Sequence, residues 1–444
     1  MRFHRSLHLK ISALVLLLAS ASVCFGQELT ITPAKVEGVY APGEKISWHI
    51  AITGDKADQV QKIGYVLRKG ALTEVGKGEL VVQNHGADLQ TQLDEPGALI
   101  AEFTALVPGN QPVKELAGAV VEPNKIGPSA PRPADFDAFW KAKVKELLFV
   151  PANPILEAGE SGNAQLGYWK ITLNNIRGTH IQGQLARPQM GAKKLPALLI
   201  VQWAGVYPLK KNTVLDRARE GWLALNINAH DLPIDRPEEW YKEREQADPI
   251  LKGYRGFGND DRERSYFLRM YLSCYRAVDY LAGRDDWDGK TLVVMGSSQG
   301  GLQAIMIGGL HPKVTGVLAN VPAGCDLTGP LVGRRGGWPQ PYERTGGKDA
   351  VKVMETSKYF DVVNFASHVK CPALVSVGLI DTTCPASGVI AAFNQIQARK
   401  ELVVMEKSDH QGRNNSQAPY NARSKVWLER FRTGSNPASE ENQP

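Results

Sequence analysis

Hydrophobic and polar residues alternate along the first part of the chain, from about residue 28 to 122. In the run 44–52, for example, every second residue from Ile46 to Ile52 is apolar. An alternation with period two is typical of β-strands that are buried on one face. Pairs of turn-forming residues such as Pro-Gly separate this run from further strand-like runs, at 63–67, 79–82 and 98–106. The pattern predicts a small β-sandwich.

A different pattern begins near residue 167, where strand-like runs alternate with helical ones. The runs 291–295 and 373–377 are apolar or small throughout, which favours strands buried on both faces. Helices are expected at 265–281 and 416–431. Further strands are expected at 168–173, 181–186, 196–202, 222–227, 314–321 and 402–405. Such alternation predicts a mostly parallel sheet with helices on both faces, an α/β fold.

The chain has 444 residues, more than one typical domain, and composition marks the boundaries. We expect a β-sandwich similar to an immunoglobulin-like module at 28–122, a Pro-rich connector at 123–134 and an α/β domain at 135–432. Residues 433–444 form a polar tail. The sandwich carries no evident catalytic group, so we interpret it as a packing or spacer module, with carbohydrate binding as the alternative.

Residues 1–26 have the pattern of a secretory signal peptide. Three basic residues lie among the first ten, and the apolar run 11–19 that follows is too short to span a bilayer. Cleavage after Ala21 and cleavage after Gly26 both fit, and Cys24 leaves a lipid-anchored form as a minority alternative. We therefore expect an exported protein, periplasmic or secreted.

Composition excludes some classes of function. The hydrophobic fraction of 43% and the charged fraction of 22% are ordinary for a globular protein. Removing the three basic residues of the signal lowers the net charge from +6 to +3, and no basic patch with interleaved aromatics suggests nucleic-acid binding. No other stretch is long and apolar enough for a membrane span. The spacing of the four remaining cysteines matches no zinc motif, and both disulfides and buried free thiols are compatible with it. These cysteines are Cys274, Cys325, Cys371 and Cys384.

The segment Gly296-Ser297-Ser298-Gln299-Gly300 has the form G-x-S-x-G. It follows a predicted strand and precedes a predicted helix, which is the context of a nucleophile elbow. Ser298 would lie at the apex of a strained turn with its hydroxyl exposed, and the flanking glycines would let strand and helix approach closely. An ordinary Gly-rich turn gives the same short match, so the assignment depends on partners elsewhere.

Two partners follow in the order that a serine nucleophile requires. Asp381 comes just after the predicted strand 373–377, and His410 comes just after the strand 402–405. His410 is the only one of the nine histidines that lies beyond Asp381. In α/β-hydrolases the acid and the histidine follow the serine in this order, each on a loop after a strand. The sequence therefore predicts Ser298 as nucleophile, Asp381 as acid and His410 as base.

Several segments resemble the acetyl xylan esterase and cephalosporin C deacetylase family. They are the entry helix Pro133–Trp140, the helix Tyr266–Leu281, the nucleophile motif Ser298–Gly301, the segment Tyr359–Ala366, and the run from Lys370-Cys371-Pro372 to Gly378–Pro385. The resemblance covers about residues 131–432 and leaves out the sandwich. It implies the same roles for Ser298, Asp381 and His410, and it implies small acetyl esters on sugars as substrates.

The chain departs from this family at two places. Where the family has a His-Gly-Tyr turn, this chain has Ala204-Gly205-Val206, so the resemblance implies the Val206 N–H as one oxyanion donor. The family's Arg-Gly-Gln appears here within Asn228-Ala229-His230-Asp231. The second oxyanion donor would be the N–H of Gln299, the residue after the nucleophile. We expect no metal and no organic cofactor, because this chemistry needs neither.

Other residues near these motifs have less specific interpretations. Asp409 and Asp326 are alternatives for the acid, and we interpret both as solvated loop carboxylates. His230 lies near Asp231 and Asp235, but a loop histidine beside surface carboxylates is commoner than a metal site. Trp338 and Tyr342 are compatible with a sugar-stacking platform and with ordinary packing of a lid.

The preferred prediction is an exported serine esterase that hydrolyses acetyl esters of oligo- or polysaccharides through an acyl-enzyme. A peptidase or a dienelactone-type hydrolase is the enzymatic alternative, since fold does not fix the substrate. A catalytically silent glycan-binding protein is the alternative from another class. A homo-oligomer is compatible with the sequence.

Overall fold

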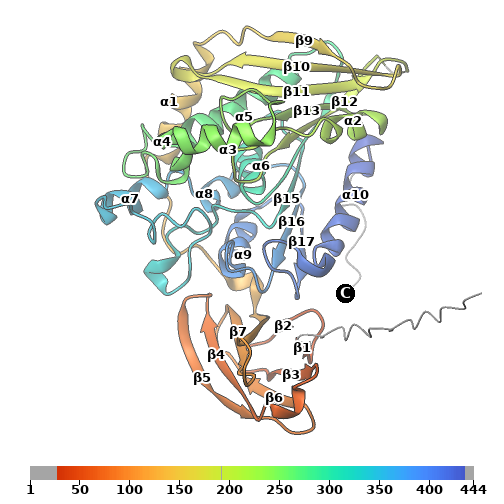
Figure 1. The fold of residues 1–444 in the computed structure, drawn as a ribbon. Coiled ribbons are helices and arrows are strands. Elements are labelled where there is room, and N and C mark those ends of the chain that lie inside the picture. Colours follow the sequence, from red (N-terminus) through yellow and green to blue (C-terminus); the bar gives the residue numbers. More distant parts are fainter. Residues whose placement is uncertain (1–27, 192, 436–444) are drawn as a thin grey trace, which may run out of the picture.

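The computed structural model describes residues 28–191 and 193–435 (Figure 1). The predicted signal peptide at 1–26 lies outside the described residues, as does most of the predicted tail at 433–444. Among the described residues, no helix has the length and apolar character to cross a membrane.

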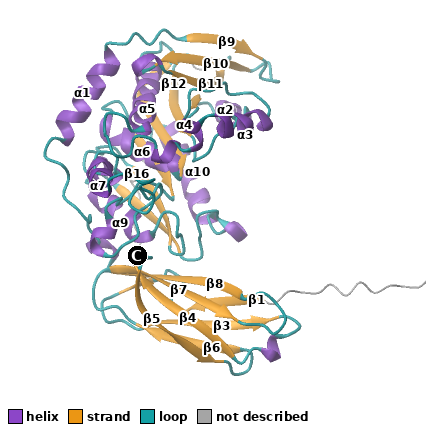
Figure 2. Ribbon diagram, turned by 60° about the vertical axis from the view of Figure 1, so that its left-hand side comes forward, coloured by secondary structure: helices purple, strands orange, loops and turns teal. Residues whose placement is uncertain are grey.

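The N-terminal part is a sandwich of two sheets around one core, as the alternation predicts (Figure 2). A three-stranded sheet has the order β1-β3-β6 and a five-stranded sheet the order β2-β8-β7-β4-β5. Trp48 and Phe103, one from each sheet, are fully buried and meet edge to face at 6.4 Å. The strands are β1 (Glu28–Pro33), β2 (Val39–Tyr40), β3 (Ile46–Thr53), β4 (Lys62–Lys69), β5 (Thr73–Val81), β6 (Gly86–Thr91), β7 (Gly97–Ala105) and β8 (Val113–Val121).

A connector with a short 3-10 turn, η2 (Pro123–Lys125), leads from the sandwich to helix α1 (Phe136–Leu148). It is fixed by side chains of the second unit. The Asn394 amide donates to the carbonyls of Pro123 (2.7 Å) and Ile126 (2.9 Å), and the Arg334 guanidinium donates to the Gly127 carbonyl (2.9 Å). The connector is therefore bound to the α/β unit along its length.

The second unit is built on a nine-stranded sheet of order β17-β16-β15-β14-β12-β13-β11-β10-β9. The six strands from β17 to β13 in that order are parallel, and the remaining three add in antiparallel fashion at one edge. The predicted mostly parallel sheet is thus confirmed. Its strands are β9 (Ile155–Gly159), β10 (Leu166–Asn174), β11 (His180–Pro188), β12 (Leu195–Val201), β13 (Leu223–Ile227), β14 (Trp287–Ser297), β15 (Gly316–Asn320), β16 (Ala373–Gly378) and β17 (Lys400–Met405).

Helices cover both faces of this sheet (Figure 1). Successive residues of one strand, such as Leu198 and Leu199, belong to different core clusters because strand side chains alternate between faces. One cluster holds α1, α5, α6, α8 and α9, and the other holds α2 and α10. The helices after α1 are α2 (Asn212–Arg219), α3 (Glu238–Ala247), α4 (Pro249–Lys252), α5 (Tyr266–Ala282), α6 (Gln299–Leu310), α7 (Ala350–Ser357), α8 (Val362–Ala366), α9 (Ala386–Gln395) and α10 (Ala418–Arg432).

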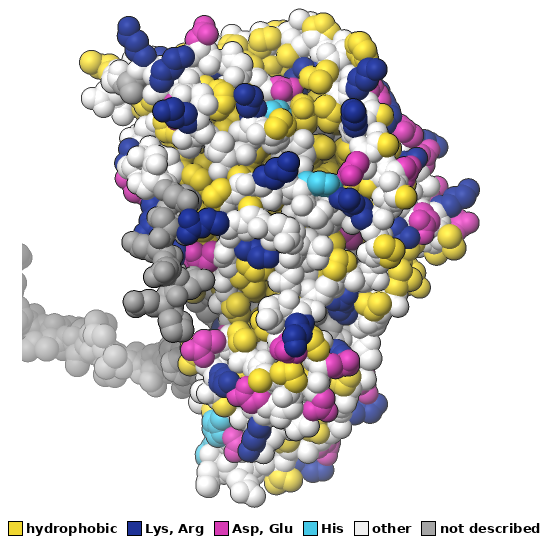
Figure 3. Space-filling view, turned by 180° about the vertical axis from the view of Figure 1, so that it is seen from behind, with side chains coloured by type: hydrophobic (Ala, Val, Ile, Leu, Met, Phe, Trp, Pro, Cys, Tyr) yellow, Lys and Arg dark blue, Asp and Glu magenta, His cyan; other side chains and the backbone are white. Residues whose placement is uncertain are grey.

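The surface and the cysteines add two observations. On the face drawn in Figure 3, basic and acidic side chains are mixed. Cys274, Cys325, Cys371 and Cys384 are buried and free, which favours the thiol over the disulfide alternative.

Candidate active site

Ser298 occupies a sharp turn between β14 and α6. Its backbone has φ 56° and ψ −118°, a conformation that costs free energy for a residue with a side chain. Neighbouring backbone holds it in place: the Ser298 N–H donates to the Asn320 carbonyl, and the Ser298 carbonyl accepts from the Ala323 N–H, both at 2.9 Å. This is the strand–turn–helix geometry expected of a nucleophile elbow.

Glycines on both sides of Ser298 make this turn sterically possible. A Cβ on Gly296 would lie 2.5 Å from the carbonyl carbon of Gly300, and a Cβ on Gly300 would lie 2.6 Å from the Val201 carbonyl oxygen. Both distances are shorter than real Cβ contacts allow. Strand, turn and helix can therefore come this close only with glycine at both positions.

The three residues predicted from the sequence lie together in one chain of hydrogen bonds. Ser298 Oγ is 2.8 Å from His410 Nε2, and His410 Nδ1 is 2.7 Å from Asp381 Oδ2. The other oxygen of Asp381 accepts from the N–H groups of Thr383 (2.8 Å) and Cys384 (2.7 Å), and the side chain is fully buried. Because Nδ1 faces a carboxylate, it carries the ring proton, which leaves Nε2 as acceptor for the serine hydroxyl.

The two alternative carboxylates do not contact His410. Asp409 accepts from the backbone N–H of Arg413 and pairs with its side chain. Asp326 accepts from the N–H and hydroxyl of Ser129 and pairs with Arg334. The interpretation of Asp326 as a solvated loop carboxylate is wrong, since it is only 1% exposed. Its role is to bind the connector to the α/β unit.

A pocket of about 560 Å³ opens over Ser298. Trp203 on its rim is 53% exposed, and one face of its indole stacks on Tyr207 with ring centroids 5.3 Å apart. The Tyr207 hydroxyl donates to the Trp203 carbonyl (3.0 Å), which fixes the pair. Trp338 also lines the pocket, whereas Tyr342 is not among the lining residues. The complete lining is Trp203, Ala204, Ser297, Ser298, Trp338, Thr383, His410, Gln411 and Gln417.

The loop Trp203–Val206, which faces Ser298, is held by buried aromatic side chains. The Gly205 N–H donates to the hydroxyl of Tyr254 (3.2 Å), and this hydroxyl donates to Oε1 of Gln299 (2.9 Å). Tyr254 comes from a 3-10 turn, η4 (Tyr254–Gly256). One hydroxyl therefore joins the loop to the residue after the nucleophile.

His230 also binds the loop Trp203–Val206, through the backbone of Gly205. Its Nε2–H donates to the Gly205 carbonyl (3.1 Å), and its Nδ1 accepts from the Tyr266 hydroxyl (2.5 Å). Burial lowers the pKa of His230 to about 4, so the ring is neutral near pH 7, as this pair of bonds requires. His230 thus lies in a loop near partly exposed carboxylates, as the sequence predicts, but it is itself buried and bonds to the loop Trp203–Val206. Asp231 and Asp235 pair instead with His180 and Lys170.

Val206 and Gln299, the expected oxyanion donors, lie next to this network. The Val206 side chain packs against Leu232, Tyr241 and Leu251, and within the described residues its N–H has no acceptor. Gln299 is the first residue of α6, where helical N–H groups lack intrahelical partners. Within the described residues both N–H groups thus lack a backbone acceptor, but neither residue is among those that line the pocket over Ser298.

One group of possible metal ligands within the described residues coincides with this site: Asp381, Cys384 and His410 offer atoms within 4.8 Å of one another. The donor set does not suit a cation. Asp381 and His410 are already bonded to each other, and burial raises the pKa of the Cys384 thiol well above its usual range, which disfavours the thiolate that binds metals.

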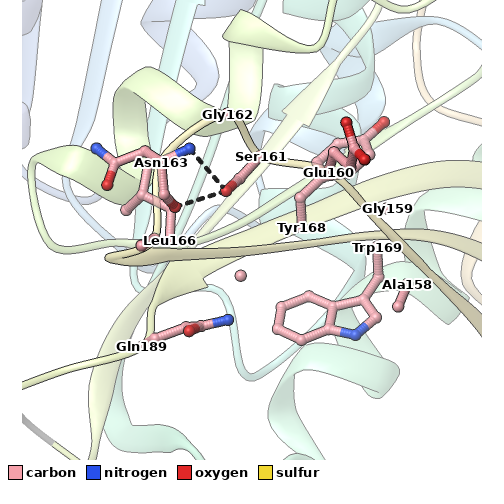
Figure 4. Close-up of a pocket in the computed structure, with 12 residues that line it drawn as sticks. Ala158, Gly159, Glu160, Ser161, Gly162, Asn163, Leu166, Tyr168, Trp169 and Gln189 are labelled. Atoms are coloured by element: carbon pink, nitrogen blue, oxygen red, sulfur yellow. Dashed lines mark hydrogen bonds between the residues drawn. The ribbon is translucent and has the colours of Figure 1, made fainter.

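A second hollow of about 540 Å³ lies where the chain turns from β9, at the edge of the sheet, to its neighbour β10 (Figure 4). Trp169 and Gln189 face each other across it. The hydroxyl of Ser161, on the loop between the two strands, donates to the Asn163 carbonyl (2.6 Å). No histidine is among the residues that line this hollow. It therefore lacks the nucleophile and base found beside Ser298.

Comparison with known proteins agrees with the geometry. Residues 122–430 match the family model of acetyl xylan esterase (AXE1). The chain belongs to the acetyl xylan esterase family. As a member it is a carboxylic ester hydrolase, and it is 30% identical to acetyl esterase Axe7A of Xylanibacter ruminicola over 384 residues, 85% of each chain.

Two solved acetyl xylan esterases have the same fold as this family member. The enzyme from Paenibacillus sp. R4 is 23% identical, with a TM-score of 0.58 over 71% of this chain and 98% of that one. Acetyl xylan esterase 1 from Thermoanaerobacterium sp. JW/SL YS485 is 21% identical, with a TM-score of 0.55 over 68% and 97%. These overlaps show that the α/β-hydrolase fold of the esterase is the shared part.

The segment Tyr359–Ala366, one of those that resemble the family, has an architectural role in this esterase. Asp361 is buried and accepts from the N–H groups of Asp326 (3.0 Å) and Leu327 (2.6 Å), and it caps helix α8. Burial, with Asp326 nearby, raises its pKa to about 8. The roles of Tyr254, Tyr266 and His230 could not be seen in the sequence, where the one signal was the departure from the family within Asn228–Asp231.

Proposed function

We propose that this protein is a serine esterase that removes acetyl groups from carbohydrates, with Ser298 as nucleophile, His410 as base and Asp381 as acid. The observation that carries the proposal is the continuous hydrogen-bond chain from Ser298 Oγ through His410 to Asp381, at 2.8 and 2.7 Å. Membership of the acetyl xylan esterase family supports the acetyl ester as substrate.

In the first half of the reaction, Ser298 Oγ attacks the acetyl carbonyl carbon while its proton passes to His410 Nε2. When the tetrahedral intermediate collapses, the bond between the carbonyl carbon and the sugar oxygen breaks. His410 gives its proton to that oxygen, so the sugar leaves as an alcohol. In the second half, water attacks the acetyl-serine with His410 again as base, releasing acetate and restoring Ser298.

The negative oxygen of each tetrahedral intermediate needs donors that are already in place. We assign this role to the N–H groups of Gln299 and Val206. Support comes from Tyr254, which fixes the loop and the Gln299 side chain through one hydroxyl. Donors of this kind contribute roughly 10²–10³ each to the rate.

The pocket favours a sugar as the leaving group. The exposed face of Trp203 can stack on the C–H face of a pyranose ring, because its other face is already packed on Tyr207. Trp338 offers a second aromatic surface, and the amides of Gln411 and Gln417 offer donors and acceptors for hydroxyl groups. Acetylated oligo- or polysaccharides are therefore the proposed substrates.

Replacing Ser298 by Ala tests the mechanism. We expect hydrolysis of p-nitrophenyl acetate and release of acetate from acetylated xylo-oligosaccharides both to fall by at least about 10³-fold. A matched control is Ser297→Ala, which removes the neighbouring pocket hydroxyl and should retain activity. Unchanged turnover by Ser298→Ala would show that the nucleophile is wrong. An absence of turnover in wild type would favour the catalytically silent glycan-binding protein.

A substrate panel tests the substrate class. We expect acetate release from acetylated xylo-oligosaccharides and no cleavage of peptide substrates. Turnover restricted to peptides or to longer acyl esters would contradict the acetyl-sugar assignment. We also propose that residues 1–26 direct export, which N-terminal sequencing of the protein recovered from the periplasm or medium would check.

A further inference from the structure

The N-terminal sandwich lies against the end of the large sheet that includes β16 and β17 (Figures 1 and 2). These are the strands whose following loops carry Asp381 and His410. One residue that contacts the sandwich is Leu379, two positions before Asp381. Its side chain is 1% exposed, and its N–H donates to the Met405 carbonyl at the start of the His410 loop (3.1 Å). Leu379 therefore connects both loops to the sandwich.

Two glycines of the sandwich form a notch around Leu379. Gly118 lies in β8, and Gly38 directly precedes the neighbouring strand β2; the Val120 N–H donates to the Gly38 carbonyl (2.8 Å). A Cβ on Gly118 would lie 2.5 Å from Leu379 Cβ and 2.6 Å from its carbonyl oxygen. A Cβ on Gly38 would lie 2.6 Å from Leu379 Cδ1. Any side chain at Gly118 would have to displace the backbone of the turn that leads to Asp381.

Gly118 has no other reason to be glycine. Its backbone is that of an ordinary strand residue, unlike Gly38, which has φ 65°. In the middle of a strand, glycine weakens the sheet and often marks a close approach of another backbone. Here the approaching backbone is the loop of Asp381.

The sandwich also contacts a third loop of the site. The Arg335 N–H donates to the Gly70 carbonyl, and the Thr73 hydroxyl donates to the Gly333 carbonyl, both at 2.8 Å. This segment leads to Trp338, whose N–H donates to the Thr383 carbonyl beside Asp381 (2.9 Å). The loops of Asp381 and Trp338 therefore contact the sandwich directly, and the His410 loop is bonded to Leu379, which contacts it.

We propose that the sandwich is a positioning element of the active site: its Gly38–Gly118 notch fixes Leu379 and thereby places the Asp381 carboxylate against His410. The inference rests on the proposed roles of Ser298, Asp381 and His410. It makes the sandwich more than the packing or spacer module that its sequence suggests. Leu379 is the positioning residue, acting through Asp381 and without contact to substrate.

The test uses the full-length protein with Gly118→Ala. As a matched control, Gly78→Ala adds a Cβ to strand β5, where the three nearest atoms all belong to the Tyr65 side chain of the sandwich itself, the hydroxyl oxygen at 2.9 Å. Active sites are counted by end-point labelling of Ser298 with a fluorophosphonate, so that kcat refers to folded enzyme. We expect Gly118→Ala to lower kcat for p-nitrophenyl acetate at least tenfold with KM within twofold of wild type, and Gly78→Ala to keep both.

Two results would overturn the inference: an unchanged kcat in Gly118→Ala, or an equal loss in Gly78→Ala, which would indicate general loosening of the sandwich. If Gly118→Ala does not fold, Leu379→Val shortens the side chain in the notch from the other side. It should lower kcat severalfold at unchanged KM, and an unchanged kcat would again overturn the inference.

Ser298→Ala separates the two proposals. Activity in that variant removes both, whereas an inactive Ser298→Ala together with a fully active Gly118→Ala removes only the role of the sandwich.

Discussion

The two sides of the active site are held in place by different means. On one side, Asp381 and His410 lie on short loops that follow neighbouring strands, and backbone N–H groups of Thr383 and Cys384 fix the carboxylate. On the other, the loop Trp203–Val206 is held by side chains from distant segments, above all Tyr254 and His230. Backbone contacts, within these loops and from the sandwich at Leu379, therefore set the position of the proposed proton-transfer groups. Side-chain contacts set the position of the loop Trp203–Val206, which with Gln299 forms the proposed oxyanion wall.

The largest effect should come from the backbone-fixed side. Asp381→Asn keeps the shape of the side chain but can donate to His410 Nδ1, which favours the tautomer that cannot accept the serine proton. We expect kcat to fall by about 10⁴. Asp409→Asn is the control, since that carboxylate pairs with Arg413 and should be replaceable. A loss of less than tenfold in Asp381→Asn would mean that the acid lies elsewhere.

The next largest effect is on the free energy of unfolding and concerns His230, which binds the loop Trp203–Val206. The His230 pKa is about 4 in the folded protein and near 6.5 when unfolded, so the unfolded state takes up the proton first as pH falls. Stability contributed by neutral His230 is fully present above about pH 6.5 and is lost progressively toward pH 4, by about 3 kcal/mol.

Urea unfolding of wild type and His230→Gln at pH 7 and pH 4.5 measures this loss. The variant cannot titrate at this position, so its stability should fall less than that of wild type over the same interval. Equal losses in the two proteins would contradict the assignment.

Tyr254→Phe should weaken the oxyanion wall without touching the proton-transfer side. It removes the acceptor for the Gly205 N–H and the donor to Gln299 while keeping the ring. We expect kcat to fall about tenfold with little change in KM, less than for direct loss of an oxyanion donor, because the backbone N–H groups themselves remain. Tyr342→Phe, at a 47% exposed tyrosine outside the pocket lining, is the matched control.

The smallest effect should come from Trp203, on the rim of the pocket over Ser298. Trp203→Ala removes the exposed indole face, and we expect KM for acetylated xylo-oligosaccharides to rise about fivefold, corresponding to about 1 kcal/mol of stacking. KM for p-nitrophenyl acetate should change less, and Trp203→Phe should restore most of the oligosaccharide binding. An equal rise for both substrates would assign Trp203 to packing of the loop.

This comparison also explains what the sequence could predict. The order strand, Ser298, strand, Asp381, strand, His410 is visible because each residue directly follows a buried apolar run. The parallel sheet follows from the same runs. By contrast, the strands β1, β2, β6, β8 and β9 were not predicted individually. β9 is exposed along its whole length, and β2 has only two residues. β1 alternates but has only two apolar residues before Pro33, and β6 and β8 contain glycine and alanine.

The contacts of Tyr254, Tyr266 and His230 could not be predicted for a different reason. Each joins segments that are distant in sequence, and nothing in a local pattern reveals which aromatic residue will meet which loop. Asp326 shows the same limit. A carboxylate in a Gly-rich loop suggests solvent, and only the packing of the connector against that loop reveals that it is buried.

The backbone of Ser298 has a consequence beyond catalysis. Its φ of 56° costs an ordinary residue roughly 1–2 kcal/mol, and glycine is the residue that escapes most of this cost. The working enzyme thus gives up folding stability to present its hydroxyl. Ser298→Gly should melt at a higher temperature than Ser298→Ala. This would make Ser298→Gly a durable inactive form for capturing an uncleaved acetylated sugar in crystals.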